Sequence, residues 1–253
     1  MNTIETSSVK SANRVLDVLE FMASRNAPVS HTELARFLAI PKSSLTQLLR
    51  NLVLRNYLQV DRDSNGYLIG DALFETARQG QRQFELADIA RPVLQKLAGE
   101  MNESCSLTVR KGSIVQMVVG ANSNQTLRYV MQEGDTAPLY AVSSGKAILT
   151  YLPEKERQEY LETVRLKPIT PATITRVEDL VEQLEKVAVE AVGYSFEEYT
   201  PGIIGMGVPI LDVNKYPIGA INFAIPTPRY NETSRVRLLG ALQRSAGLIE
   251  SKL

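Results

Sequence analysis

Apolar positions in the N-terminal quarter of the chain recur at intervals of three and four residues, the spacing of an amphipathic helix. Between residues 12 and 23 they form one stripe, made of Ala12, Val15, Leu16, Leu19, Met22 and Ala23. Pro28 interrupts the pattern. Ser30 and Glu33 then stand at the spacing of a capping box, which predicts the start of a second, short helix. Its inward-facing positions are expected to be Leu34, Ala35 and Leu38.

A third helix is predicted over residues 42–54, directly after Pro41. Its apolar residues fall within about 100° of arc; they are Leu45, Leu48, Leu49 and Leu52. The opposite side carries hydroxyls, amides and a guanidinium but no carboxylate: Ser43, Ser44, Thr46, Gln47, Arg50 and Asn51. Such groups contact phosphates and read base edges in the major groove of DNA. The alternative is an ordinary solvated polar face.

Two short strands are predicted after the third helix, at residues 57–60 and 67–69. The loop between them, residues 61–66, ends in Asn-Gly, a strong hairpin signal. Three helices followed by a β-hairpin are the element order of a winged helix-turn-helix. The N-terminal region is therefore predicted to be mostly α, with a β-hairpin wing.

Residues 71–103 have the composition of a helical connector. Gly80 and the polar run at residues 81–83 predict a break or bend in it. Pro92 suits the first turn of a following helix, where the missing N–H costs nothing.

The rest of the chain alternates between strand and helix patterns. One hairpin is expected at residues 107–119 around Lys111-Gly112-Ser113, and another at residues 206–225 around a turn at 212–217. Helices are expected at residues 144–152, 153–164, 177–191 and 231–251. An antiparallel sheet covered by helices, an α+β domain, is the natural assembly of these elements.

Composition adds a few limits. A chain of 253 residues suits two domains, and no apolar run is long enough to span a membrane. The polar N-terminus lacks the apolar core of a signal peptide, and one cysteine, Cys105, excludes an intramolecular disulfide, so a cytoplasmic protein is expected. Residues 9–66 hold eight Lys/Arg and five Asp/Glu, a net charge of +3 that leaves −3 for the remainder. Such a modest bias does not by itself indicate nucleic-acid binding.

Several enzyme signatures are present only in part. A zinc site or a Ser-His-Asp triad would have to use the single histidine, His31. Residues 143–146 spell S-x-x-K, but neither S-D-N nor K-T-G follows. Ala147 stands where a P-loop needs Ser or Thr, and the glycines of residues 202–207 precede a strand rather than open a helix. We therefore expect no catalytic residue, no metal and no cofactor.

The chain resembles the IclR family of transcriptional regulators along nearly its whole length. Residues 9–20 look like that family's opening helix, 40–50 like its recognition helix and 66–70 like its wing. Shorter stretches at 138–147, 193–195, 201–202 and 208–210 look like its effector-binding domain, which is similar to GAF and PAS sensor folds. Asn56 stands where the family usually has glycine, and asparagine also tolerates the left-handed conformation.

The resemblance implies a division into a DNA-binding domain at residues 1–70, a helical linker at 71–103 that helps to hold dimers together, and an effector-binding domain at 104–253. It places DNA contacts on Arg14, Lys42, Ser43, Ser44, Thr46, Gln47 and Arg50. It places the effector pocket on Tyr129, Ala137, Ser143, Ser144, Glu197, Ile203 and Gly205.

We accordingly expect a homodimeric or tetrameric repressor or activator that binds a near-palindromic operator in double-stranded DNA. Its effector is expected to be a small organic or sugar acid, held where Ser143 and Ser144 open a helix. Capping of that helix by the serines is the simpler alternative. Gly145 is expected to allow close backbone approach, and Lys146 to add positive charge or to run to solvent. Two other functions stay open: an enzyme with Ser143 or Ser144 as nucleophile and Lys146 as base, and a protein-binding winged helix.

Overall fold

The computed structural model describes residues 9–25, 27–130 and 132–253, with the backbone alone for residues 79–84. The N-terminus, for which the sequence predicts no signal peptide, lies largely outside these ranges. The chain divides into two compact units, Met1–Arg82 and Gln83–Leu253. We call them the N-terminal unit and the C-terminal unit and describe each by itself.

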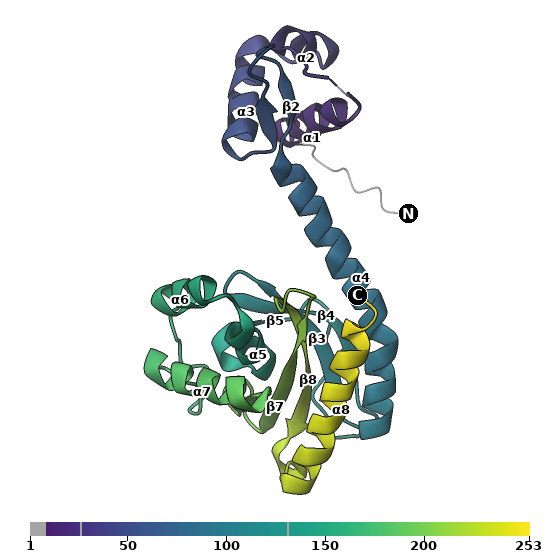
Figure 1. Cartoon of the computed structure of the whole chain (residues 1–253), viewed down its shortest axis with the longest axis vertical. Coiled ribbons are helices and arrows are strands. Elements are labelled where there is room, and N and C mark those ends of the chain that lie inside the picture. The colour runs from purple at the N-terminus through teal and green to yellow at the C-terminus, as the bar shows by residue number, and fades with distance from the viewer. Residues whose placement is uncertain (1–8, 26, 131) are drawn as a thin grey trace. The chain divides into compact units, whose positions relative to one another are not determined.

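The N-terminal unit is a winged helix-turn-helix, as the sequence predicts (Figure 1). Its elements are α1 (Lys10–Ala23), α2 (His31–Phe37), α3 (Lys42–Leu54), β1 (Leu58–Val60) and β2 (Tyr67–Ile69). The two strands pair antiparallel, with Leu58 opposite Ile69. Its core contains Val18, Met22, Leu34, Leu45, Leu49, Leu52 and Leu58.

Local signals in this unit act as predicted, with one exception. The Ser30 side chain accepts a hydrogen bond from the Glu33 N–H (3.2 Å) and caps α2. Asn56 has a φ of 59°, the left-handed conformation expected there. The predicted apolar stripe of α1 is buried only in part: Leu16 is 56 % exposed, and Ala12 and Ala23 are exposed as well. The buried face of α1 is centred on Val18, and two residues correspond to about 200° around a helix.

A single helix, α4 (Asp71–Met101), replaces the interrupted connector expected from the sequence. It runs through Gly80 without a break and carries Pro92 in its interior instead of in a first turn. A proline inside a helix costs about 3 kcal/mol. Burial of Val93, Leu94 and Leu97 in the core of the C-terminal unit offsets this cost and holds the helix through the proline.

The C-terminal unit is an α+β domain built on a six-stranded antiparallel sheet with the order β5-β4-β3-β8-β7-β6. The strands are β3 (Ser104–Lys111), β4 (Ile114–Ala121), β5 (Thr136–Pro138), β6 (Gly193–Phe196), β7 (Ile203–Leu211) and β8 (Pro217–Pro226). Both predicted hairpins are confirmed: β3 pairs with β4 around Gly112, and β7 pairs with β8. Strands β5 and β6 were not predicted from their residue pattern.

Helices cover both faces of this sheet (Figure 1). The predicted helices are confirmed as α5 (Ser143–Tyr151), α6 (Glu154–Thr163), α7 (Val177–Glu190) and α8 (Glu232–Glu250). One core lies between the sheet, α8 and the C-terminal half of α4, and a second is formed by α5, α6, α7 and the turn η1 (Leu139–Ala141). Within the described ranges, no helix combines the length and hydropathy needed to cross a bilayer.

Candidate functional site

Helix α3 buries one side and exposes the other as predicted. Leu45, Leu49 and Leu52 are buried in the core of the N-terminal unit. Most of the side chains expected to touch DNA are exposed, and Ser44 is half-buried; the exposed ones are Lys42, Ser43, Thr46, Gln47 and Arg50. Arg14, on α1, is half-buried. The exposed side of α3 therefore offers donors and positive charge without any carboxylate.

Thr46 has a partner that the sequence analysis did not identify. Its hydroxyl donates to the Lys42 carbonyl oxygen (2.8 Å), and its oxygen lies 3.0 Å from Nε2 of His31, on α2. The hydroxyl proton is thus already used, so Thr46 can only accept a further hydrogen bond. His31 and Thr46 are fifteen residues apart. No local sequence pattern links them.

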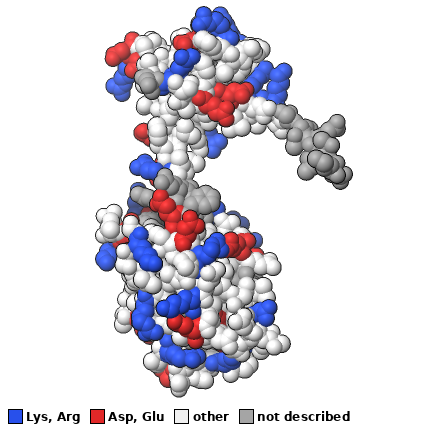
Figure 2. Space-filling view, turned by 90° about the vertical axis from the view of Figure 1, so that its right-hand side faces the viewer, with Lys and Arg blue, Asp and Glu red and all other residues white. Residues whose placement is uncertain are grey.

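The charge on the N-terminal unit is distributed in separate groups. Figure 2 shows basic side chains interspersed with acidic ones on this face, rather than a continuous basic surface. This arrangement agrees with the modest net charge of residues 9–66. The ability of the unit to bind DNA therefore depends on which residues α3 exposes, more than on the overall field.

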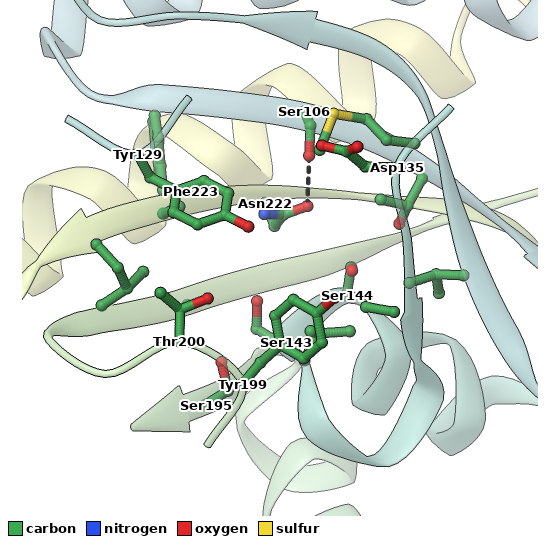
Figure 3. Close-up of a pocket in the computed structure, with 18 of the residues that line it drawn as sticks. Ser106, Tyr129, Asp135, Ser143, Ser144, Ser195, Tyr199, Thr200, Asn222 and Phe223 are labelled. Atoms are coloured by element: carbon green, nitrogen blue, oxygen red, sulfur yellow. Dashed lines mark hydrogen bonds between the residues drawn. The ribbon is translucent and has the colours of Figure 1, made fainter. Parts of the chain in front are cut away.

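A cavity of about 280 Å³ lies in the C-terminal unit, between the sheet and the beginning of α5 (Figure 3). All six strands of the sheet, β3 to β8, contribute to its wall. Its described lining consists of Ser106, Thr108, Val115, Met117, Tyr129, Asp135, Thr136, Ala137, Val142, Ser143, Ser144, Ser195, Tyr199, Thr200, Ile203, Gly205, Asn222, Phe223 and Ala224.

Six of the seven residues expected in an effector pocket line this cavity: Tyr129, Ala137, Ser143, Ser144, Ile203 and Gly205. Glu197 is not among the lining residues. Its backbone is left-handed (φ 57°), and its carboxylate accepts a hydrogen bond from the Gly202 N–H (2.8 Å). Glu197 therefore closes a turn beside the cavity instead of facing into it.

Ser143 and Ser144 occupy the first turn of α5 without capping it. The cap position belongs to Val142, and no side chain makes a capping hydrogen bond. Both serines are only 2 % exposed, and among the described residues neither hydroxyl has a hydrogen-bond partner. The first intrahelical bond runs from the Lys146 N–H to the Val142 carbonyl. The N–H groups before Lys146 therefore have no partner within the helix.

Two glycines on β7 allow α5 to begin directly against the sheet. A Cβ on Gly205 would lie 2.8 Å from Oγ of Ser143, and one on Gly207 would lie 2.9 Å from the backbone nitrogen of Ser144. Gly145 has a different role from the one expected. A Cβ there would lie 2.1 Å from the Leu139 carbonyl oxygen, so the close approach at Gly145 is to the chain's own preceding turn.

Lys146 neither adds charge to the cavity nor runs to solvent, contrary to both expectations. It is fully buried, and Nζ donates to the Glu198 carboxylate (2.6 Å), to Oε1 of Gln183 (2.5 Å) and to the Tyr194 carbonyl oxygen (2.9 Å). Burial lowers the pKa of Lys146 and raises the pKa of Glu198, while the attraction between the two charges opposes both shifts. All three donor directions of Nζ are thus used for structure, so Lys146 is not poised as a base for Ser143.

The remaining wall is rich in oxygen atoms and carries little charge. Asp135 provides the one carboxylate of the described lining, and no Lys, Arg or His is part of it. Ser106 donates a hydrogen bond to Oδ1 of Asn222 across the β3–β8 pair (2.9 Å). Burial, with Tyr129 and Asp135 nearby, raises the pKa of Tyr199. The residue pattern did not single out these lining residues, although polar Ser106 and Thr108 alternate with apolar Cys105, Leu107 and Val109 in β3.

Comparison with known proteins agrees with both units. The model of the bacterial transcriptional regulator IclR C-terminal family matches residues 81–251, and that of the IclR helix-turn-helix domain matches residues 11–62. The chain belongs to the IclR family of transcriptional regulators. The helix-turn-helix match spans α1 to α3 and extends into the wing, so the exposed side of α3 belongs to a DNA-binding domain.

Relatives with assigned names share about a quarter of their residues with the chain. The HTH-type transcriptional regulator BhcR of Paracoccus denitrificans is 26% identical over 228 residues, which cover 90% of this chain and 81% of that protein. The transcriptional repressor IclR of Escherichia coli is 26% identical over 239 residues, covering 94% of this chain and 87% of that protein. Both relatives are named as regulators of transcription.

Solved structures of the family share the fold. The Thermotoga maritima IclR structure has a TM-score of 0.66 at 29% identity, and the match covers 96% of this chain and 98% of that one. An IclR homolog from Microbacterium hydrocarbonoxydans, crystallised with 4-hydroxybenzoate, has a TM-score of 0.62 at 22% identity, with coverage of 95% and 98%. The winged helix-turn-helix and the α+β domain are therefore the fold of this family.

Proposed function

We propose that a small organic or sugar acid binds in the cavity of the C-terminal unit and controls binding of the operator by the N-terminal unit. The observation that carries this proposal is the pair of hydroxyls of Ser143 and Ser144, which line the cavity at the beginning of α5 and have no hydrogen-bond partner among the described residues. Polar groups that leave water normally have hydrogen-bond partners, so a cavity wall with two free hydroxyls is suited to a ligand that supplies acceptors.

The beginning of α5 favours an anion. Free N–H groups and the positive end of the helix dipole attract negative charge, and the two hydroxyls add donors. The cavity volume suits a small molecule. The complex of the Microbacterium homolog with 4-hydroxybenzoate supports a small aromatic or aliphatic acid as the kind of molecule to test here.

The domain organisation belongs to the same proposal. We assign residues 1–70 to operator binding, 71–103 to a linker and 104–253 to effector binding. The division between the two compact units, at Arg82, falls inside the proposed linker. A homodimer or tetramer reading a near-palindromic operator fits a helix-turn-helix regulator, because paired half-sites require paired recognition helices.

Replacement of both Ser143 and Ser144 by Val tests the effector site. A hydrogen bond to a charged group contributes about 1.5–3 kcal/mol, so two losses of about 2 kcal/mol each should weaken effector affinity by a factor of order a thousand. The effector is first identified by thermal-shift screening of organic and sugar acids, and its affinity is then measured by calorimetry. Operator binding without effector should persist.

Thr163→Val is the matched control for the serine variant, because it removes an exposed hydroxyl on α6 that bonds only within its own helix. It should leave effector affinity unchanged. A double serine variant that binds as tightly as the parent would place the effector elsewhere.

Arg50→Ala and Gln47→Ala test the DNA-binding side of α3. Each should weaken operator binding by about 1–3 kcal/mol per lost base contact, while folding is unchanged because both side chains are exposed. Gel-shift or anisotropy titration at fixed salt measures the effect. Arg237→Ala, which removes the same charge from an exposed position on α8, is the control. Parent-like affinity in both α3 variants would rule out these base contacts.

A further inference from the structure

Thr46, on the exposed side of α3, has its hydroxyl engaged in two hydrogen bonds. The hydroxyl donates to the Lys42 carbonyl oxygen in its own helix (2.8 Å), and its oxygen lies 3.0 Å from Nε2 of His31. Because the Thr46 proton already points to Lys42, the imidazole is the donor in the second bond, which places a proton on Nε2 of His31. The two bonds therefore link the first residue of α2 to the first half of α3.

These bonds fix how the Thr46 side chain is turned. A threonine in a helix divides between two χ1 rotamers, because its oxygen can bond a carbonyl of the preceding turn in either. Two bonds at the same oxygen select one orientation, in which Oγ1 faces the Lys42 carbonyl and His31. The Cγ2 methyl is then the part of this exposed side chain that makes no polar contact.

The neighbouring side chains on α3 differ from Thr46 in this respect. Ser43, Gln47 and Arg50 are exposed, and among the residues that the structure describes they make no side-chain hydrogen bond. Their donors are therefore available for phosphates and base edges. Thr46 has no donor left, and only one lone pair of its oxygen is still free. What Thr46 mainly offers to a partner is thus an apolar group.

The major groove of DNA presents one apolar group, the C5 methyl of thymine, and side chains read it by apolar contacts such as that of a threonine methyl. We propose that Thr46 reads a thymine through contact between the two methyl groups, and that His31 is the positioning residue that holds the Thr46 methyl toward the base. This inference rests on the proposed contact between α3 and the operator. It names the base recognised at one position of each half-site.

The test uses the full-length protein and an operator selected with it from a random duplex library. Each thymine of that operator is replaced in turn by deoxyuridine, which lacks only the C5 methyl and keeps every hydrogen-bonding group. Fluorescence anisotropy at fixed salt measures the affinities. At one thymine in each half-site, the replacement should weaken binding of the parent about three- to fivefold, the effect of burying one methyl group.

Two substitutions separate the methyl of Thr46 from its hydroxyl. Thr46→Ser removes the methyl, so deoxyuridine at that position should change its affinity by less than about 1.5-fold. Thr46→Val keeps the methyl without the hydroxyl and should stay as sensitive as the parent. Thr76→Ser is the matched control, because Thr76 is also exposed and its hydroxyl donates to the carbonyl four residues earlier, at Ala72 (2.7 Å). It should leave the deoxyuridine profile unchanged.

Substitution of His31 tests its positioning role through the same ratio of affinities. His31→Ala should lower the discrimination at this thymine to below about twofold, because Thr46 regains a second rotamer. His31→Gln, whose amide is again a donor, should restore the discrimination. In His31→Ala/Thr46→Val it should persist, since valine keeps one χ1 rotamer in a helix without a partner. A ratio unchanged in His31→Ala would overturn the positioning role, even if both affinities fall.

Three results would overturn the reading of thymine by Thr46. They are a selected operator in which no thymine is sensitive to loss of its methyl, parent-like sensitivity in Thr46→Ser, and loss of sensitivity in Thr46→Val. The last result would assign Thr46 to hydrogen bonding through its remaining lone pair.

Failure of the proposed contact between α3 and the operator has a different signature. Arg50→Ala and Gln47→Ala would then bind the operator as tightly as the parent. If these two variants lose affinity while Thr46→Ser keeps the thymine discrimination, α3 reads the operator and only the role of Thr46 is wrong.

Discussion

At the scale of single residues, the Lys146–Glu198 ion pair is the interaction whose disruption should cost the most folding stability. Both groups are almost completely buried, and Nζ also binds Gln183 on α7 and the Tyr194 carbonyl on β6. The pair therefore ties α5, which bears the two cavity serines, to the segment that carries Tyr199 and Thr200. Removing one partner leaves a buried, unpaired charge and strongly destabilises the fold. Replacing both partners by well-packed apolar side chains does not.

Substitution of Lys146 by Met should therefore destabilise the C-terminal unit by about 3–5 kcal/mol, because the Glu198 carboxylate is left buried and unpaired. The double variant Lys146→Met/Glu198→Met should be less destabilised than Lys146→Met alone. Urea unfolding followed by circular dichroism gives the four free energies of unfolding that the comparison needs: those of the parent, of Lys146→Met, of Glu198→Met and of the double variant. Additive effects of the two substitutions would show that the charges do not stabilise each other.

At the scale of elements, we expect α3 to separate base reading from phosphate contact along one helix. Gln47 and Arg50 lie in the middle of its exposed side, while Lys42 is its first residue. A cation at that place suits a phosphate contact, and phosphate contacts carry no sequence information. The two roles can be separated because only phosphate contacts release counterions in proportion to the charge neutralised.

Lys42→Ala should weaken binding to all DNA sequences alike and lower the magnitude of the slope of log K against log salt by about 1. The Lys42 carbonyl, which accepts the Thr46 hydroxyl, is unaffected by this substitution. Operator titrations at several salt concentrations measure the slope, and Gln47→Ala should leave it unchanged. A changed base preference with an unchanged slope would assign Lys42 to base reading instead.

At the scale of the whole molecule, the two units have separate hydrophobic cores. The core of the N-terminal unit consists of buried residues between Val18 and Leu58. The two main cores of the C-terminal unit consist of residues from Leu86 onward. Cys105 belongs to the larger of these two. It is fully buried, Sγ donates to the Leu94 carbonyl (3.4 Å), and burial raises its pKa to about 12.

Cys105 should therefore report unfolding of the C-terminal unit alone. At pH 8 a thiol with so high a pKa carries almost no thiolate, so the native protein should resist a disulfide reagent such as DTNB. Labelling should begin at the urea concentration where the C-terminal unit unfolds. Leu49→Ala should lower the stability of the N-terminal unit by about 2–5 kcal/mol, but it should not accelerate labelling of Cys105. Rapid labelling of native protein, or acceleration by Leu49→Ala, would contradict separate unfolding.

Local pattern alone determined much of this protein. The apolar arc of α3, the Ser30 cap, the left-handed Asn56 and both sheet hairpins follow from residues within a few positions of one another. Periodicity and turn chemistry operate over that range, which is why they predicted these elements. Six of the seven expected pocket residues also line one cavity, although that expectation came from resemblance rather than from pattern.

Tertiary structure decided what depends on partners distant in sequence. Lys146 meets Glu198 fifty-two residues later, and Ser106 meets Asn222 across 116 residues. Pro92 stays inside α4 because burial of the neighbouring side chains outweighs the local cost of a proline. Leu16 is exposed because only part of the apolar stripe of α1 packs into the core. Asp135 becomes a lining residue only because the segment before β5 forms backbone hydrogen bonds with Met117 on β4. Burial and long-range pairing supply energies that no local pattern contains.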